Sequence, residues 1–194
     1  MAAGRIIFLN GTSSSGKTTI ARALQEILPE PHMHVAIDGF FSMYPERVWN
    51  PTRQEDAEVL QRLVPTVVSG VQRAVAALAE AGNQIILDHV LEDPAWLREC
   101  VERWAGLEVL LVGLRCPLPV LEQREAERGD RAPGLAKVQY ARVHAHGLYD
   151  VEVDASVLDV DACVTEIVEA LARGGAPRAF DRLQRSFATN AFET

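Results

Sequence analysis

The segment GTSSSGKTT, residues 11–19, combines glycines, hydroxyl side chains and a lysine in an order that can bind phosphate. It contains the pattern G-x-x-x-x-G-K-[ST] of a phosphate-binding loop. Glycines let the backbone N–H groups turn inward around an anion, and the following helix adds its positive N-terminal end. The lysine can reach the β- and γ-phosphates, and the threonine hydroxyl can bind Mg²⁺. We therefore expect a nucleoside triphosphate to be bound by Gly11, Thr12, Ser13, Ser14, Ser15, Gly16, Lys17, Thr18 and Thr19, with Thr18 as a metal ligand.

Two carboxylates follow short apolar runs that resemble buried strands. Asp38 comes after HVAI at 34–37, where it could orient an acceptor hydroxyl and take its proton; the alternative is a helix N-cap. Asp88 follows IIL at 85–87, where it could hold Mg²⁺ or contact the acceptor; the alternative is a turn at a strand end. The adjacent His89 is either structural or an acceptor contact.

Three arginines lie at positions i, i+4 and i+7 of the segment LEQREAERGDRAPG, so one helix face would carry them all. On a mobile lid near residues 124–137 they would supply planar donors to a transferring phosphoryl group. We expect Arg128 and Arg131 to act with Lys17 and Asp38 in catalysis, and Arg124 to contact the nucleotide. The alternative is a solvated face that pairs with nearby glutamates.

Aromatic residues are concentrated directly after Asp38. Phe40, Phe41, Tyr44 and Trp49 could form the wall of a pocket for a partly apolar acceptor, together with Asp38, Asp88 and His89. The alternative is that these aromatic residues belong to the core between helices.

The composition excludes several other classes of protein. The chain has 194 residues and a net charge of −8, which disfavours a nucleic-acid partner because phosphate backbones attract basic surfaces. No stretch is long and apolar enough for a membrane span, and residues 1–17 look like a first strand and not like a signal peptide. We therefore expect a cytoplasmic protein with no membrane partner, and a homo-oligomer is compatible with the sequence.

The apolar runs indicate strands that alternate with helices. Strands are expected at 6–10, 34–37, 85–87, 107–114 and 151–153, and helices at 17–28, on both sides of Pro65, and at 94–104, 119–128 and 161–173. This order predicts an α/β fold with a parallel sheet whose ligands lie at the carboxyl ends of the strands. We expect one domain over residues 1–175 and a C-terminal extension over 176–194. No asparagine is followed by Lys-x-Asp, as guanine recognition would require, so a kinase is favoured over a switch GTPase.

At this point the chain resembles the chloramphenicol phosphotransferase family. The similarity rests on IIFLNGTSSSGKTT at 6–19, VAID at 35–38, IILDHV at 85–90, GLRC at 113–116, REAERGDRAPG at 124–134 and VHAHGLYDVEVD at 143–154. It implies a P-loop NTPase fold like that of adenylate kinase, with strand order 2-3-1-4-5. It also implies ATP and Mg²⁺ as co-substrates, a small hydroxyl compound as acceptor, and Asp38 as the base. The segment FFSMYPERVWNPTR at 40–53 departs from the family, so the family's antibiotic is less well supported as a substrate than the activity.

Three other functions are compatible with the residues. The chain could phosphorylate another alcohol, such as a sugar, a nucleoside or a different antibiotic. It could also be a non-catalytic ATP-binding regulator, although Lys17, Asp38 and the arginines of a lid are all present. A nucleic-acid end kinase is the third alternative, and the negative charge disfavours it.

Overall fold

A computed structural model describes residues 2–128, 134–175 and 177–190. Its centre is a five-stranded parallel sheet in the order β2-β3-β1-β4-β5, which confirms the predicted fold class and strand order. The strands are β1 (Ile6–Gly11), β2 (His32–Ala36), β3 (Gln84–His89), β4 (Val109–Arg115) and β5 (Val151–Asp154). The helices are α1 (Lys17–Ile27), α2 (Ile37–Phe41), α3 (Glu46–Trp49), α4 (Gln54–Glu80), α5 (Pro94–Arg103), α6 (Leu118–Arg128), α7 (Leu135–Tyr140), α8 (Val160–Arg173) and α9 (Ala179–Asn190).

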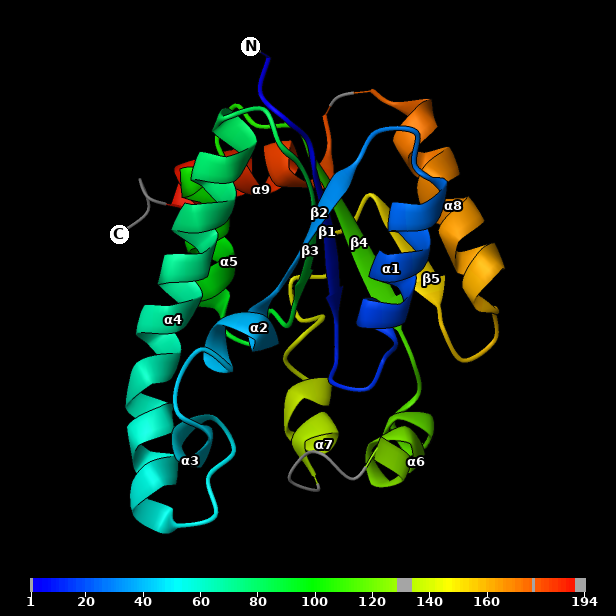
Figure 1. Ribbon diagram of the computed structural model, residues 1–194. Coiled ribbons are helices and arrows are strands. Elements are labelled where there is room, and N and C mark those ends of the chain that lie inside the picture. The colour runs from blue at the N-terminus through cyan, green and yellow to red at the C-terminus, as the bar shows by residue number, and fades with distance from the viewer. Residues whose placement is uncertain (1, 129–133, 176, 191–194) are drawn as a thin grey trace.

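Helices cover both faces of the sheet (Figure 1). Helices α1 and α8 lie on one face, and α4, α5 and α9 lie on the other. Strand β1 is buried along its whole length, and its side chains alternate between the two cores. Ile7 and Leu9 pack with the helices of the first face, whereas Ile6 and Phe8 pack with those of the second. The sheet thus lies between two apolar layers. Helices α2, α3, α6 and α7 lie near the edge at which the strands end, which we call the carboxyl edge.

Helix α4 runs without interruption through Pro65, which corrects the expectation of two separate helices. Proline lacks the N–H that would bond to the carbonyl of Gln61, four residues earlier. Both Pro65 and Gln61 are exposed, so water can solvate the carbonyl that has lost its partner. The second half of the continuous helix packs in the core that also contains α5 and α9. Its first half extends to the carboxyl edge of the sheet and forms part of the site described below.

The segment after α8 is structured. Helix α9 packs against β4 and α5, and it buries Ala179, Phe180 and Leu183. The ring of Phe180 stacks on Trp104 with 5.6 Å between the ring centroids. The tail therefore contributes to one of the two cores, and the proposed domain boundary at residue 175 stays a prediction. Among the described residues, no helix is long and apolar enough to cross a membrane.

Candidate active site

The phosphate-binding loop joins β1 to α1 and has the backbone that its sequence predicts. Gly16 precedes the helix with φ 96°, and Ser14 has φ 64°, so two left-handed residues turn the loop around a concave centre. Gly11 is required for close packing, since a Cβ there would lie 2.7 Å from the Ser15 Oγ atom and 2.9 Å from the Leu114 carbonyl oxygen. The loop thus has the form of an anion site at a helix N-terminus.

Lys17 folds back over this loop. Its Nζ donates to the carbonyl oxygens of Gly11, at 2.9 Å, and Thr12, at 3.0 Å, and it lies 4.0 Å from an oxygen of Asp88. The ammonium group is buried, so it is held over the centre of the loop by carbonyl oxygens and a carboxylate. This geometry keeps a positive charge where phosphate oxygens would bind.

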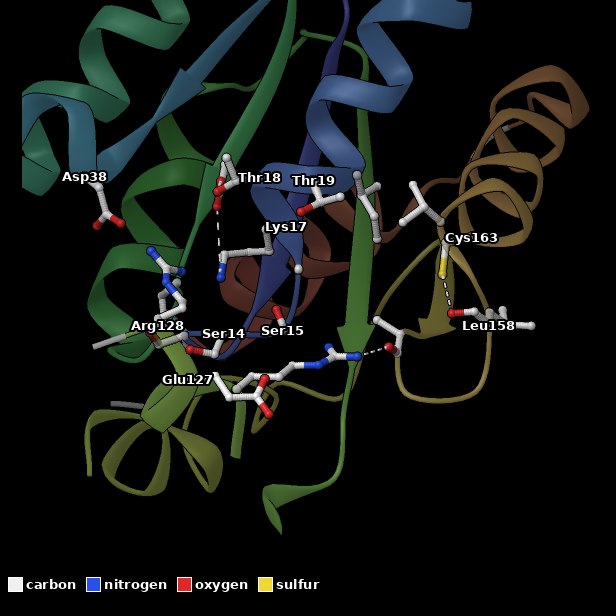
Figure 2. A pocket seen from close by; sticks show the side chains of 18 of the residues that line it. Ser14, Ser15, Lys17, Thr18, Thr19, Asp38, Glu127, Arg128, Leu158 and Cys163 are labelled. Carbon is white, nitrogen blue, oxygen red and sulfur yellow. Dashed lines mark hydrogen bonds and ion pairs between the residues drawn. The ribbon is translucent and has the colours of Figure 1, made fainter. Parts of the chain in front are cut away.

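A cavity of about 590 Å³ opens in front of the loop (Figure 2). We call it the phosphate cavity. Its walls come from the loop and the start of α1, from α2, from the end of β3, from α6, and from the segment after β5 together with the start of α8. The predicted site residues that line it are Ser13, Ser14, Ser15, Gly16, Lys17, Thr18, Thr19, Asp38, Asp88, Arg124 and Arg128. Gly11 and Thr12 lie behind this surface, where their carbonyl oxygens accept from Lys17. The sequence expectation that two carboxylates meet the loop at one edge is therefore matched by the geometry.

Asp88 is the electrostatic centre of this edge. Its Oδ2 accepts a hydrogen bond from the Thr18 hydroxyl at 2.7 Å, and Nε2 of His34 lies 3.6 Å from the same oxygen. Burial alone would raise the pKa of Asp88, but His34, the charge of Lys17 and the Thr18 hydroxyl outweigh it and hold the pKa below its ordinary value. At 3.6 Å the His34 contact is longer than a normal hydrogen bond, so we regard Lys17 and Thr18 as the firmer partners. An ionised carboxylate beside a hydroxyl is a donor pair that suits Mg²⁺, which takes few ligands from protein.

Asp38 lies two residues beyond the end of β2, in the first turn of α2. The strand is therefore shifted from the expected range 34–37 to His32–Ala36. The N-cap of α2 is Ala36, and no side chain caps this helix end, so the alternative of an Asp38 cap is not found. Asp38 lines the phosphate cavity and also a second cavity behind it. It is thus placed between the two.

The arginines of the predicted lid have separate surroundings. Arg124 donates to the Ala155 carbonyl oxygen at 2.8 Å and lies 3.8 Å from the Cys116 sulfur, which fixes it to the segment after β5. Arg128 lies at the end of α6, and its guanidinium points into the phosphate cavity toward the side of Asp38 (Figure 2). Arg131 lies outside the described residues.

Glu125 has a structural position. Its buried carboxylate accepts hydrogen bonds from the backbone N–H groups of Gly134, at 2.7 Å, and Ala136, at 2.9 Å. These bonds join α6 to the first turn of α7. Glu125 is therefore not part of a solvated helix face, as the alternative to a lid would require. Its carboxylate instead connects the end of α6 to the start of α7.

The second cavity has a volume of about 350 Å³ and mostly apolar walls. Four of the residues that the sequence analysis assigns to the acceptor site line it: Phe41, Trp49, Asp38 and His89. Phe40 and Tyr44 do not line this cavity. Phe40 packs against the core, as Phe41 also does, and Tyr44 is 36% exposed. Asp88 lines the phosphate cavity only. Residues that sequence reasoning missed complete the wall: Leu60, Val64 and Val68 of α4, Glu92 and Trp96 near α5, and Leu135 and Gln139 of α7.

His89 is fixed between two aromatic rings. Its ring is nearly parallel to Phe8, at 16° with centroids 6.0 Å apart, and to Trp96, at 23° and 6.1 Å. The Nδ1 atom accepts a hydrogen bond from the Val90 N–H at 2.7 Å. Burial, with a smaller contribution from the charge of Lys17, lowers the pKa of His89 to about 4. The ring is therefore neutral near pH 7.

A polar network lies behind the phosphate loop, within the family motif at 143–154. Asn10, at the end of β1, donates to the Tyr149 hydroxyl at 2.7 Å and to the Val143 carbonyl oxygen at 2.9 Å. The Tyr149 hydroxyl in turn lies 2.6 Å from Nδ1 of His144. The segment was recognised in the sequence only as part of the resemblance. Its contacts show that it supports the strand from which the loop begins.

The sequence of the chain is similar to those of known proteins. Residues 4–172 match the family model described as chloramphenicol phosphotransferase-like protein. A protein of Mycobacterium tuberculosis, provisionally named an O-phosphotransferase and found in two strains, is 31% identical over 96% of this chain and 91% of its own length.

Solved structures share the fold. A sugar kinase from Janibacter sp. HTCC2649 aligns with a TM-score of 0.64 and 21% identity, covering 87% of this chain and 95% of that one. The adenylylsulfate (APS) kinase CysC of Mycobacterium tuberculosis, solved with AMPPNP and APS, aligns with a TM-score of 0.62 and 15% identity, covering 89% and 99%.

The fold and the phosphate loop define the class of proteins with the P-loop NTPase fold. Within that class, the chain belongs to the chloramphenicol phosphotransferase-like family, and it is a phosphotransferase. The predicted resemblance is confirmed.

Proposed function

We propose that this protein transfers the γ-phosphoryl group of ATP to a hydroxyl group of a small, partly apolar acceptor. The observation that carries the proposal is the position of Asp38, which lines both the phosphate cavity and the apolar cavity. An acceptor in the apolar cavity would present its hydroxyl to this carboxylate on one side and to the γ-phosphate on the other. The family and the provisional name of the mycobacterial relative support the same reaction.

In the reaction, the acceptor oxygen forms a bond to the γ-phosphorus while the bond from phosphorus to the β,γ-bridging oxygen breaks. ADP leaves with the electron pair of that bond, and the hydroxyl proton passes to the Asp38 carboxylate. Lys17 and the N–H groups of the loop would hold the phosphates, and Arg128 would neutralise charge on the transferring group. The Thr18 hydroxyl and Asp88 would hold Mg²⁺, which supplies further charge neutralisation when it is bound with the nucleotide.

The apolar wall favours an aromatic or otherwise apolar alcohol over a free sugar, because a sugar needs many polar partners. Chloramphenicol or an antibiotic of similar size is the acceptor that this wall and the family support, and antibiotic resistance is then the physiological role that we propose. A kinase of another alcohol is the alternative.

The test is a screen of the protein with Mg·ATP against chloramphenicol, aromatic alcohols, nucleosides and sugars. Mass spectrometry would detect the phosphorylated product. We expect phosphorylation of at least one aromatic alcohol, and we expect Asp38→Asn to lower turnover by about 10²–10⁴-fold with little change in ATP binding.

Asp161→Asn is the matched control, because Asp161 is exposed in the first turn of α8 and does not itself line either cavity. It should retain normal turnover. Phosphorylation of sugars alone would contradict the proposed acceptor class. No phosphorylated product from any acceptor, or near-normal turnover by Asp38→Asn, would contradict the proposed reaction.

A further inference from the structure

A buried hydrogen-bond donor lies in the wall of the apolar cavity, and its tautomer can be derived from its contacts. His89 is 1% exposed and lines this cavity at the end of β3. Its Nδ1 accepts the hydrogen bond of the Val90 N–H, so Nδ1 carries no proton. The ring proton must then be on Nε2, a tautomer assigned from the hydrogen-bond pattern. His89 therefore presents an Nε2–H donor.

This donor has no protein partner among the described residues. Nε2 of His89 is buried and makes no hydrogen bond to any of them. The two aromatic neighbours do not replace one, because an N–H lies in the plane of its own ring. Phe8 and Trp96 are nearly parallel to that plane, so the N–H cannot point at either ring face. A buried donor without a partner is costly, and it is common where a ligand supplies the missing acceptor.

Other polar groups also line the cavity. Asp38 and Glu92 are carboxylates, which accept hydrogen bonds when ionised. The side-chain oxygen of Gln139 already accepts from the Ser13 N–H at 2.9 Å. Asn50 is exposed at the rim. Trp49, Trp96, Asn50 and Gln139 also carry N–H donors on this wall. Among the described residues that line the cavity, Nε2 of His89 is the buried side-chain donor that has no hydrogen-bond partner.

We propose that His89 is a specificity-determining residue, and that its Nε2–H donates to an oxygen of the acceptor remote from the hydroxyl that is phosphorylated. This inference rests on the proposed function and narrows it: the substrate is an apolar alcohol that also carries a hydrogen-bond acceptor such as a carbonyl, nitro or ether oxygen. Asp38 follows β2 and His89 ends β3, and the two strands are neighbours in the sheet. The substrate would therefore span from one strand end to the next. Alcohols that lack the second oxygen leave Nε2–H unpaired and bind less tightly.

The test uses pairs of alcohols that match in shape and differ in one oxygen. The probes are 3-(4-acetylphenyl)propan-1-ol and 3-(4-ethylphenyl)propan-1-ol, with the 3-substituted isomers of both to vary the distance between the hydroxyl and the oxygen. Binding to the full chain is measured by calorimetry without ATP, so that it does not depend on turnover. We expect at least one acetyl compound to bind about tenfold more tightly than its ethyl partner.

Two substitutions at His89 separate a donor at Nε2 from a merely structural ring. His89→Gln places its amide nitrogen near the position of Nε2, and we expect it to keep much of the acetyl preference. His89→Asn places its polar atoms near the position of Nδ1, and we expect it to lose the preference while ethyl compounds bind as before. Equal losses for both members of a pair in both variants would overturn the proposal.

A measurement on the unaltered protein covers the case in which neither variant folds. With ¹⁵N-labelled histidine, the chain gives ring signals from only five residues, so the His89 N–H can be followed directly. Addition of the acetyl probe should shift this signal, and addition of the ethyl probe should not. No acetyl preference in any isomer pair, or equal shifts with both probes, would overturn the role of His89.

The same probes distinguish failure of this inference from failure of the proposed function. If the acetyl and ethyl compounds bind with equal affinity and both are phosphorylated, the proposed reaction stands and the proposed role of His89 is wrong. Preferential binding of the acetyl compound without any phosphoryl transfer would support the role of His89 and contradict the reaction.

Discussion

The side-chain oxygen of Gln139 accepts a hydrogen bond of 2.9 Å from the backbone N–H of Ser13, a residue of the phosphate loop. Gln139 is buried on α7, and it also lines the apolar cavity. One side chain thus contacts the loop that would hold the nucleotide and the wall that would hold the acceptor. Helix α7 is in turn anchored to α6 through Glu125. A change at Gln139 should therefore affect both substrates.

We predict that Gln139→Ala raises KM for ATP and for the acceptor several-fold, and lowers the free energy of unfolding by about 1–3 kcal/mol. The reason is that the Ser13 N–H would lose its buried hydrogen bond to Gln139. Steady-state kinetics and urea unfolding would measure the two effects. Gln123→Ala is the matched control, because Gln123 is exposed on α6 and bonds only to Glu127 of its own helix among the described contacts. A change in neither substrate's KM would show that Gln139 is only a part of the core.

The network behind the loop should make stability depend on pH. Burial, followed by the charge of Arg115, lowers the pKa of His144 to about 4, from an ordinary value of 6.5. Between these two pH values the unfolded chain binds a proton on His144 that the folded chain does not. The contribution of His144 to the free energy of unfolding should therefore be fully present above pH 6.5 and be lost as the pH falls toward about 4.

His144→Asn tests the contribution of this one ring. Its side-chain oxygen can still accept from the Tyr149 hydroxyl, but it does not titrate. Urea midpoints at pH 7.5 and pH 5 should show a smaller acid loss in the variant than in the wild-type protein. Some loss should remain, because burial also lowers the pKa of His146. Equal acid losses in both proteins would show that His144 is not responsible.

The parts of the site that could be predicted from the sequence are those in which short segments carry both the structure and the chemistry. The loop at 11–19 and the carboxylates at strand ends are of this kind, because parallel strands bring their carboxyl ends to one edge. The wall of the apolar cavity is different. It combines α4, α5 and α7, and a helical pattern does not show which distant helix its apolar face will meet.

The cluster from Phe40 to Trp49 shows the same limit within ten residues. All four aromatics have the composition of a pocket wall, but only Phe41 and Trp49 line the cavity, and both Phe40 and Phe41 pack against the core. The short helices α2 and α3 set these positions, and neither has enough periodicity to be recognised in advance. Pro65 gave a wrong expectation for a different reason. The sequence predicts two helices, but α4 is continuous, because the cost of a proline in a helix depends on whether the unpaired carbonyl is solvated.

Arg128 offers a test of the lid. We predict that Arg128→Ala lowers kcat more than it raises KM for ATP, because a guanidinium at the transferring group acts mainly in the transition state. Arg62→Ala is the matched control, since Arg62 is exposed on α4 and lines neither cavity. Steady-state kinetics with varied ATP would separate the two constants. Unchanged kinetics in Arg128→Ala would contradict a role in catalysis and favour the alternative that Arg128 belongs to a solvated helix face.

Trp49 and Tyr44 give the sharpest comparison for the acceptor cavity, because the sequence assigns both to its wall and the structure places only Trp49 there. We predict that Trp49→Ala raises KM for an aromatic acceptor about tenfold or more with less effect on kcat, as expected when binding is lost equally from the ground state and the transition state. Tyr44→Ala removes an aromatic ring of similar size from the same segment and should leave KM nearly unchanged. Acceptor kinetics at saturating ATP would measure both variants. If Tyr44→Ala raises KM as much as Trp49→Ala does, the segment from α2 to α3 closes over the acceptor as a unit, and the cavity described here is only part of the acceptor site.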